Sequence, residues 1–136
     1  MTEDHPLRTV ETLALVALGG FAGANLRYVL DVALGTLPTG LFGTLAANVA
    51  GCVLLGFVLY EEVYVGVFSR QLRVAVGTGF LSSFTTYSTF AVQTADAASD
   101  SLAVAVGNVG ANYALGFLGV VLGRWVALSF AAEVAD

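Results

Sequence analysis

Four long apolar segments, separated by short polar or charged stretches, constrain this chain of 136 residues more than any other feature. They run over about Leu13–Leu34, Leu41–Tyr60, Leu72–Thr94 and Leu102–Phe130. Because a bilayer core of about 30 Å is crossed by about 20 helical residues, each segment is long enough to span a membrane. We therefore expect an all-α integral membrane protein with a single domain, residues 1–136, and four transmembrane helices.

The composition supports a membrane protein and excludes several other classes. Only 11% of the residues are charged, whereas a soluble domain carries about 25%. The net charge of −5 argues against a nucleic-acid partner. Most carboxylates, with Glu61 and Glu62 among them, lie outside the apolar segments and are expected to be solvated. The absence of lysine and the acidic loops suit a high-salt cytoplasm, so we expect a multi-pass protein of a prokaryotic, halophilic cell membrane.

The arginines predict the orientation of the chain. With four spans, Arg8, Arg70, Arg73 and Arg124 fall on one side of the membrane, and only Arg27 leans toward the other. Since arginine is enriched on the cytoplasmic side, both termini are expected to lie inside.

The stretch GFLSSFTTYSTF (Gly79–Phe90) carries seven hydroxyl groups within an apolar segment: Ser82, Ser83, Thr85, Thr86, Tyr87, Ser88 and Thr89. Adjacent hydroxyl residues project in different directions, so one helix face cannot hold them all. A break in the third helix accommodates them, because irregular backbone is tolerated at membrane depth where protein or an aqueous cavity covers it. Free carbonyls at such a break can bind a cation, and the restarting helix can direct donors at an anion.

Amide groups add further donors at membrane depth. Thr44 and Asn48 lie one turn apart in the second segment, and Asn108 and Asn112 lie one turn apart in the fourth. Asparagine offers two N–H donors, and no carboxylate lies near the middle of a segment. This inventory favours a path for a small, strongly hydrated anion. Arg27 is either an orientation anchor or part of an electropositive vestibule.

Three motifs in order along the chain resemble the CrcB/Fluc family of fluoride channels. They are GGFAGANLRY (19–28), GTLAANVAGC (43–52) and GFLSSFTTYSTF (79–90). The resemblance implies four-helix subunits that pair antiparallel into a dimer with two fluoride pores and one structural sodium ion at the interface. Such a channel is not an enzyme, and it exports cytoplasmic fluoride passively and relieves fluoride toxicity.

The resemblance also assigns residues. The backbone carbonyls of Ser82 and Thr85 would hold sodium, and Arg27 would lie in the vestibule. The residues implied to line the pore are Thr44, Asn48, Tyr87, Ser88, Thr89 and Phe90. The chain departs from the family pattern at Ser82-Ser83, where two glycines are usual, and at Tyr87, where phenylalanine is usual. Asn108 and Asn112 stand where tyrosine or serine is expected, and they either line the pore or bridge helices. Tyr113 is expected to pack.

Other functions and assemblies remain open at this point. A small proton-coupled multidrug antiporter is also built from four short helices, but it needs an embedded carboxylate, and Glu11 at the start of the first span is the candidate. A structural membrane subunit is a third interpretation, which leaves the hydroxyl cluster unexplained. The partner is either an identical chain or a homologue of opposite orientation, and the arginine bias slightly favours the homologue.

Overall fold

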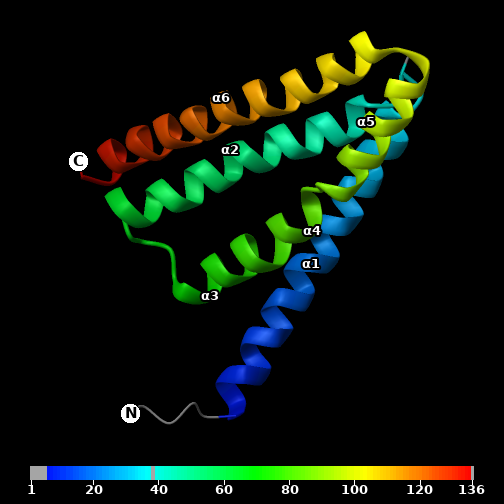
Figure 1. The fold of residues 1–136 in the computed structure, drawn as a ribbon. Helices are drawn as coiled ribbons and strands as arrows, with labels where there is room; N and C mark the ends of the chain where they lie inside the picture. The colour runs from blue at the N-terminus through cyan, green and yellow to red at the C-terminus, as the bar shows by residue number, and fades with distance from the viewer. Residues whose placement is uncertain (1–5, 38, 136) are drawn as a thin grey trace.

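A computed structural model describes residues 6–37 and 39–135 of the chain, and these residues form helices joined by turns (Figure 1). In chain order the elements are α1 (Pro6–Leu34), α2 (Phe42–Tyr64), α3 (Arg70–Arg73), the π-helix η1 (Val74–Leu81), α4 (Ser82–Phe84), α5 (Ser88–Asp100) and α6 (Leu102–Ala135). Among the described residues, three helices are long and apolar enough to cross a membrane, over Arg8–Leu34, Phe42–Tyr64 and Leu102–Val134. The multi-pass membrane class expected from the sequence is confirmed.

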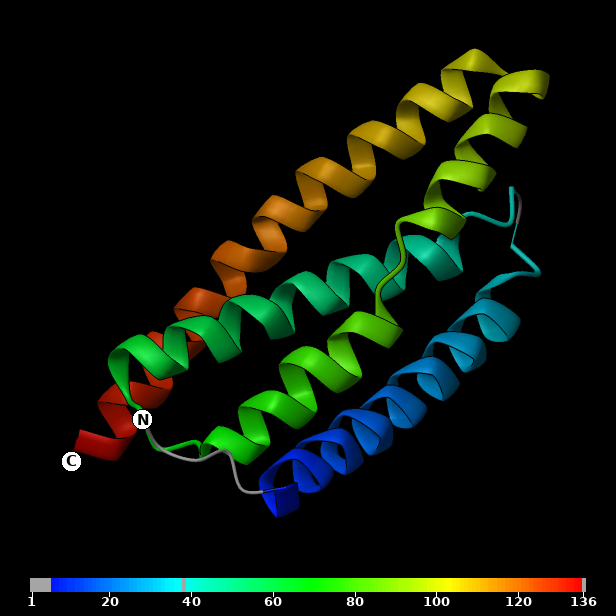
Figure 2. The same ribbon diagram turned by 60° about the horizontal axis from the view of Figure 1, so that its bottom comes forward.

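The third apolar segment forms two helical pieces. The first piece joins α3, η1 and α4 without interruption from Arg70 to Phe84. At Thr85 the backbone is extended, with φ −83° and ψ 157°, and helical structure resumes with α5 at Ser88. Three residues that follow one another in the hydroxyl-rich motif therefore lie outside any helix, and the two pieces leave the break in different directions (Figure 2).

Two helix pairs form the body of the fold, and glycines permit the close approach in both. α2 packs along α6, where a Cβ at Gly56 or Gly123 would overlap the backbone of the other helix. α1 packs along η1 and α4, where Gly19 and Gly23 lie against the backbone of Ala75 and Phe80. Small residues let helix backbones approach in this way in membranes, where van der Waals packing drives association.

One end of the bundle gathers four of the five arginines. The beginnings of α1 and α3 and the ends of α2 and α6 lie at this end (Figure 2). Arg8 and Arg70 line a common cavity there, and Arg124 donates to the hydroxyl of Tyr64 at 3.4 Å. The guanidinium of Arg124 also lies 5.4 Å from the centre of the Tyr60 ring, within range of a cation–π interaction.

The expectation that Glu61 is solvated is wrong, because its side chain is fully buried. α2 continues past Glu61 to Tyr64, and the turn after it folds back over the carboxylate. Oε1 of Glu61 accepts a hydrogen bond from the N–H of Phe68 at 2.9 Å, and Oε2 lies 3.3 Å from the guanidinium of Arg73. The Phe68 ring packs against the rings of Phe57 and Phe130, which anchors this turn on α2 and α6. Periodicity alone does not reveal a turn that returns to its own helix.

Candidate functional site

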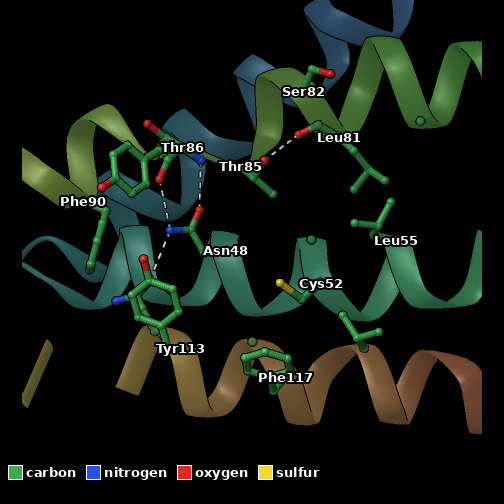
Figure 3. Close-up of a pocket in the computed structure, with 16 residues that line it drawn as sticks. Asn48, Cys52, Leu55, Leu81, Ser82, Thr85, Thr86, Phe90, Tyr113 and Phe117 are labelled. Carbon is green, nitrogen blue, oxygen red and sulfur yellow. Dashed lines mark hydrogen bonds between the residues drawn. The ribbon is translucent and has the colours of Figure 1, made fainter. Parts of the chain in front are cut away.

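Asn48 of α2 holds the break between α4 and α5 (Figure 3). Its Oδ1 accepts a hydrogen bond from the N–H of Thr86 at 2.8 Å, and its Nδ2 donates to the carbonyl of Thr86 at 3.1 Å. The side-chain amide thus pairs with the backbone in the way that another peptide group would. Unpaired backbone groups away from water are costly, so this pairing stabilises an irregular backbone between two helical pieces.

The hydroxyl of Thr86 starts the helix that follows the break. Its Oγ1 accepts a hydrogen bond from the N–H of Thr89 at 3.2 Å, as an N-terminal capping side chain does. The same oxygen contacts Oγ1 of Thr89 at 3.1 Å and Oγ of Ser88 at 3.4 Å. Thr86 is 9% exposed, and the sequence placed it in the hydroxyl cluster without assigning it a role at the site. Its position three residues before Thr89, at the start of a helical stretch, is a capping signal that could have identified it.

On the other side of the break, backbone carbonyls are left without helical partners. Thr85 closes the preceding helix, since both its N–H and its hydroxyl donate to the carbonyl of Leu81, at 3.0 and 2.9 Å. Among the described residues, no backbone N–H from beyond the break donates to the carbonyls of Ser82, Ser83, Phe84 or Thr85. Such oxygens are the ligands that hard cations take. The expected sodium ligands, Ser82 and Thr85, therefore lie where free carbonyls are present.

A cavity of about 650 Å³ opens beside the break, between α2, the two pieces of the third segment, and α6 (Figure 3). Its polar lining consists of hydroxyl and amide groups, and no described lining residue is Asp, Glu, Lys or Arg. The lining residues are Asn48, Gly51, Cys52, Leu55, Gly77, Leu81, Ser82, Thr85, Thr86, Tyr87, Phe90, Asn112, Tyr113, Gly116, Phe117 and Val120.

Three aromatic rings lie together at this cavity. The centres of the Tyr87 and Phe90 rings are 5.8 Å apart at an angle of 52°. Tyr113 of α6 meets Phe90 edge-on, at 6.3 Å and 85°. Tyr113 was expected only to pack, yet its side chain is 56% exposed and lines the cavity. Ring edges carry partial positive charge, so this group can face an anion.

The two asparagines of α6 link three helices. Asn112 accepts a hydrogen bond from Nδ2 of Asn48 at 3.2 Å, which joins α6 to α2. Asn108 donates to Oγ1 of Thr94 at 2.8 Å, which joins α6 to α5. Asn112 lines the cavity, whereas Asn108 does not and is 7% exposed. The sequence left open whether these asparagines line the pore or bridge helices. Asn108 bridges helices, and Asn112 bridges helices and also faces the cavity.

Several residues expected at the pore lie outside this cavity. Ser88 and Thr89 contact Thr86 but do not line the cavity. Arg27, which was expected in a vestibule, is a half-buried residue of α1 and does not line this cavity either. Thr44 is 2% exposed, and its Oγ1 has no hydrogen-bond partner within the described part of the chain. This hydroxyl is one turn from Asn48 on the same helix.

Glu11, the carboxylate considered for an antiporter, lies far from the break in a second cavity of about 400 Å³. Arg8, Arg70 and Gln71 line that cavity with it, at the arginine-rich end of the bundle. Within the described part of the chain, the fully buried carboxylate is instead Glu61, whose two oxygens are engaged by Phe68 and Arg73.

Comparison with known proteins identifies the family. The family described as CrcB-like protein, Camphor Resistance (CrcB), matches residues 14–124. The chain is 51% identical over 131 residues to "Fluoride-specific ion channel FluC 1" of Haloarcula marismortui, which covers 96% of this chain and 97% of the relative. It is 49% identical to "Fluoride-specific ion channel FluC 2" of Halobacterium salinarum, with 90% and 91% covered. It is 40% identical to "Fluoride-specific ion channel FluC 1" of Methanospirillum hungatei, with 85% and 77% covered. The resemblance seen in the three motifs is thus confirmed, and the chain belongs to the CrcB-like protein family.

Proposed function

We propose that this protein is a fluoride-selective channel that lets cytoplasmic fluoride leave down its gradient and so relieves fluoride toxicity. The observation that carries the proposal is the cavity at the helix break, which is lined by amide and hydroxyl groups and aromatic rings, with no carboxylate among the described lining residues. Relatives that match nearly the whole chain bear the name of fluoride-specific ion channels, which supports the choice of anion.

The chemistry of the cavity fits a small anion. Asn48, Asn112 and Thr86 are hydrogen-bonding groups at the cavity, and Tyr87 and Tyr113 add phenolic hydroxyls. Each donor replaces part of the hydration shell that fluoride loses on leaving water. The edge of Phe90 adds electrostatic attraction without requiring a proton to move. Passive conduction of this kind uses no cofactor for the chemistry and no covalent intermediate.

A second subunit completes the channel in this proposal. The cavity is open on one side, and Tyr87 on its wall is 73% exposed. An antiparallel partner would cover this side and close two pores. The third apolar segment, with its two helical pieces, would then cross the bilayer together with the three long helices and make four spans. The free carbonyls of Ser82 and Thr85 would then hold one structural sodium ion with their counterparts. Serine in place of glycine leaves these oxygens available, since the backbone supplies them.

The arginine distribution bears on which partner is present. Arg8, Arg70, Arg73 and Arg124 lie near one end of the bundle, and this end is expected to be cytoplasmic. A bias of four to one disfavours insertion of identical chains in both directions. We therefore favour a homologous partner of opposite orientation over a homodimer. The relatives from halophilic archaea support a halophilic cell membrane as the location.

The test is fluoride efflux from liposomes that contain this protein alone, loaded with fluoride or with chloride. The expected result is rapid fluoride efflux with little chloride efflux and no dependence on a proton gradient. Equal rates for the two anions would rule out a selective channel, and efflux that requires an opposing proton gradient would favour an antiporter. If the chain alone is inactive, co-reconstitution with a homologue of opposite orientation separates a missing partner from a wrong function.

A further inference from the structure

Asn48, Asn112 and Asn108 form a continuous chain of hydrogen bonds that starts at the helix break and ends on α5. Nδ2 of Asn48 donates to Oδ1 of Asn112 at 3.2 Å, and Nδ2 of Asn112 donates to Oδ1 of Asn108 at 3.1 Å. Nδ2 of Asn108 donates to Oγ1 of Thr94 at 2.8 Å, and the Thr94 hydroxyl donates to the carbonyl of Phe90 at 2.7 Å. We call this set the asparagine chain.

Backbone groups at both ends dictate the direction of this chain. At the break, the N–H of Thr86 can only donate, so Oδ1 of Asn48 must face it and Nδ2 must face Asn112. At the other end, the carbonyl of Phe90 can only accept, so the Thr94 hydroxyl donates to it and accepts from Asn108. The orientation of every side-chain amide between these ends follows from these two bonds. The oxygen and nitrogen of an asparagine side chain have similar shapes, and here the hydrogen-bond partners determine which atom is which.

The donors of Asn48 are already used in this arrangement. Its two N–H groups bond the carbonyl of Thr86 and the side-chain oxygen of Asn112. The bond to Thr86 holds the break, whereas the bond to Asn112 joins two residues that both line the cavity. An anion entering the cavity therefore obtains an N–H from Asn48 by taking the place of the Asn112 oxygen.

We infer that Asn112 is a specificity-determining residue whose side-chain oxygen occupies the anion position at Asn48. The inference rests on the proposed function of the same cavity. Fluoride is close in size to an oxygen atom and accepts N–H bonds strongly, so it can replace the amide oxygen without moving α6 away from α2. Chloride is larger and a weaker acceptor, so it does not compensate for the lost amide bond. The exchange rejects chloride because an unsatisfied donor and acceptor are costly in a site that the partner subunit closes to water.

The test measures fluoride and chloride flux for Asn112→Leu and Asn112→Ala, with Asn108→Leu as the matched control. Asn108 belongs to the same asparagine chain but lies outside the cavity. Its replacement leaves Asn112 oriented, because Nδ2 of Asn112 also donates to the backbone carbonyl of residue 108 at 3.0 Å. The expected result is a fluoride-to-chloride flux ratio at least tenfold lower in both Asn112 variants and changed less than threefold in Asn108→Leu. A role in helix packing alone would lower thermal stability in all three variants and leave the ratio intact. In an Asn48→Ala background, Asn112→Ala is expected to change the ratio no further.

A second measurement uses the unmodified protein and does not depend on whether the variants fold. The chain has four asparagines, so selective 15N labelling gives four side-chain amide groups in NMR spectra. Fluoride is expected to shift the signals of Asn48 and Asn112, and chloride at equal concentration is not. Asn25, which donates to the carbonyl of Phe21 within α1, is the internal control. Two outcomes would overturn the inference and leave the proposed function standing, provided that the unmodified protein conducts fluoride selectively. In the first, the fluoride-to-chloride flux ratio is unchanged in the Asn112 variants. In the second, the NMR signal of Asn112 does not respond to fluoride. If the unmodified protein conducts no fluoride with or without a partner, the proposed function itself fails.

Discussion

The carboxylate of Glu61 lies 3.3 Å from the guanidinium of Arg73. The Glu61 side chain is fully buried, and the Arg73 side chain is 22% exposed. The same guanidinium lies 3.7 Å from Glu62, whose side chain is 58% exposed. Two adjacent glutamates thus share one arginine in different environments. Removal of one partner from a buried pair leaves an uncompensated charge, whereas an exposed pair contributes about 0–1 kcal/mol.

Glu61→Gln is therefore expected to destabilise the protein by about 1–3 kcal/mol, because Arg73 loses a buried partner and keeps part of its hydration. Glu62→Gln is the matched control and is expected to change stability by less than about 0.5 kcal/mol. Thermal unfolding in detergent, followed by circular dichroism, measures both. Equal losses of stability in Glu61→Gln and Glu62→Gln would contradict the prediction that the buried ion pair contributes more than the exposed one.

Asn48→Ala is expected to reduce fluoride flux by tenfold or more and to leave the assembly intact. The substitution removes two bonds to Thr86 and the donor at the cavity, and a hydrogen bond left unmade away from water costs about 1–3 kcal/mol. Arg27→Ala is expected to reduce flux less, and mostly at low salt, since salt screens longer-range attraction. Liposome efflux at two ionic strengths checks the ranking, and a larger loss for Arg27→Ala would contradict it.

Gly123→Val is expected to separate α2 from α6 and to prevent stable folding, since a Cβ at Gly123 would overlap the backbone of Val53 and Phe57. Gly110→Ala lies on the same helix, and no described atom lies within 4 Å of a Cβ built there. This control is expected to be neutral, or more stable by about 0.5–1 kcal/mol, because alanine favours helix over glycine. Size-exclusion profiles in detergent and thermal unfolding compare the two. A stable, monodisperse Gly123→Val protein would mean that the close approach of α2 and α6 is not required.

The orientation of the chain is tested by cysteine labelling after replacement of Cys52, the single native cysteine. A cysteine introduced near Asp136 is expected to react from the cytoplasm only, because four arginines lie near one end of the bundle. This outcome requires a partner of opposite orientation for an antiparallel dimer. Labelling of comparable extent from both sides would instead establish dual topology and a homodimer.

The sequence by itself determined the membrane class, because four apolar segments with few charges have no other stable environment. It also determined the family, since three motifs stand in order over most of the chain, and it placed the hydroxyl cluster where the helix is interrupted at Thr85. These features are local, because the length of an apolar segment, the residue types and their spacing can be read from consecutive residues.

Only the tertiary structure decided which polar groups meet. Asn48 and Thr86 are 38 residues apart, and Asn48 and Asn112 are 64 residues apart, so no periodicity relates them. The bond between Asn48 and Asn112 requires the close approach of α2 and α6 that their glycines permit. Burial of Glu61 likewise depends on a turn that folds back, in which Phe68 packs against Phe57 of α2 and Phe130 of α6. Helix contacts of this kind are set by shape complementarity between distant segments, which the linear order of residues does not encode in any local pattern.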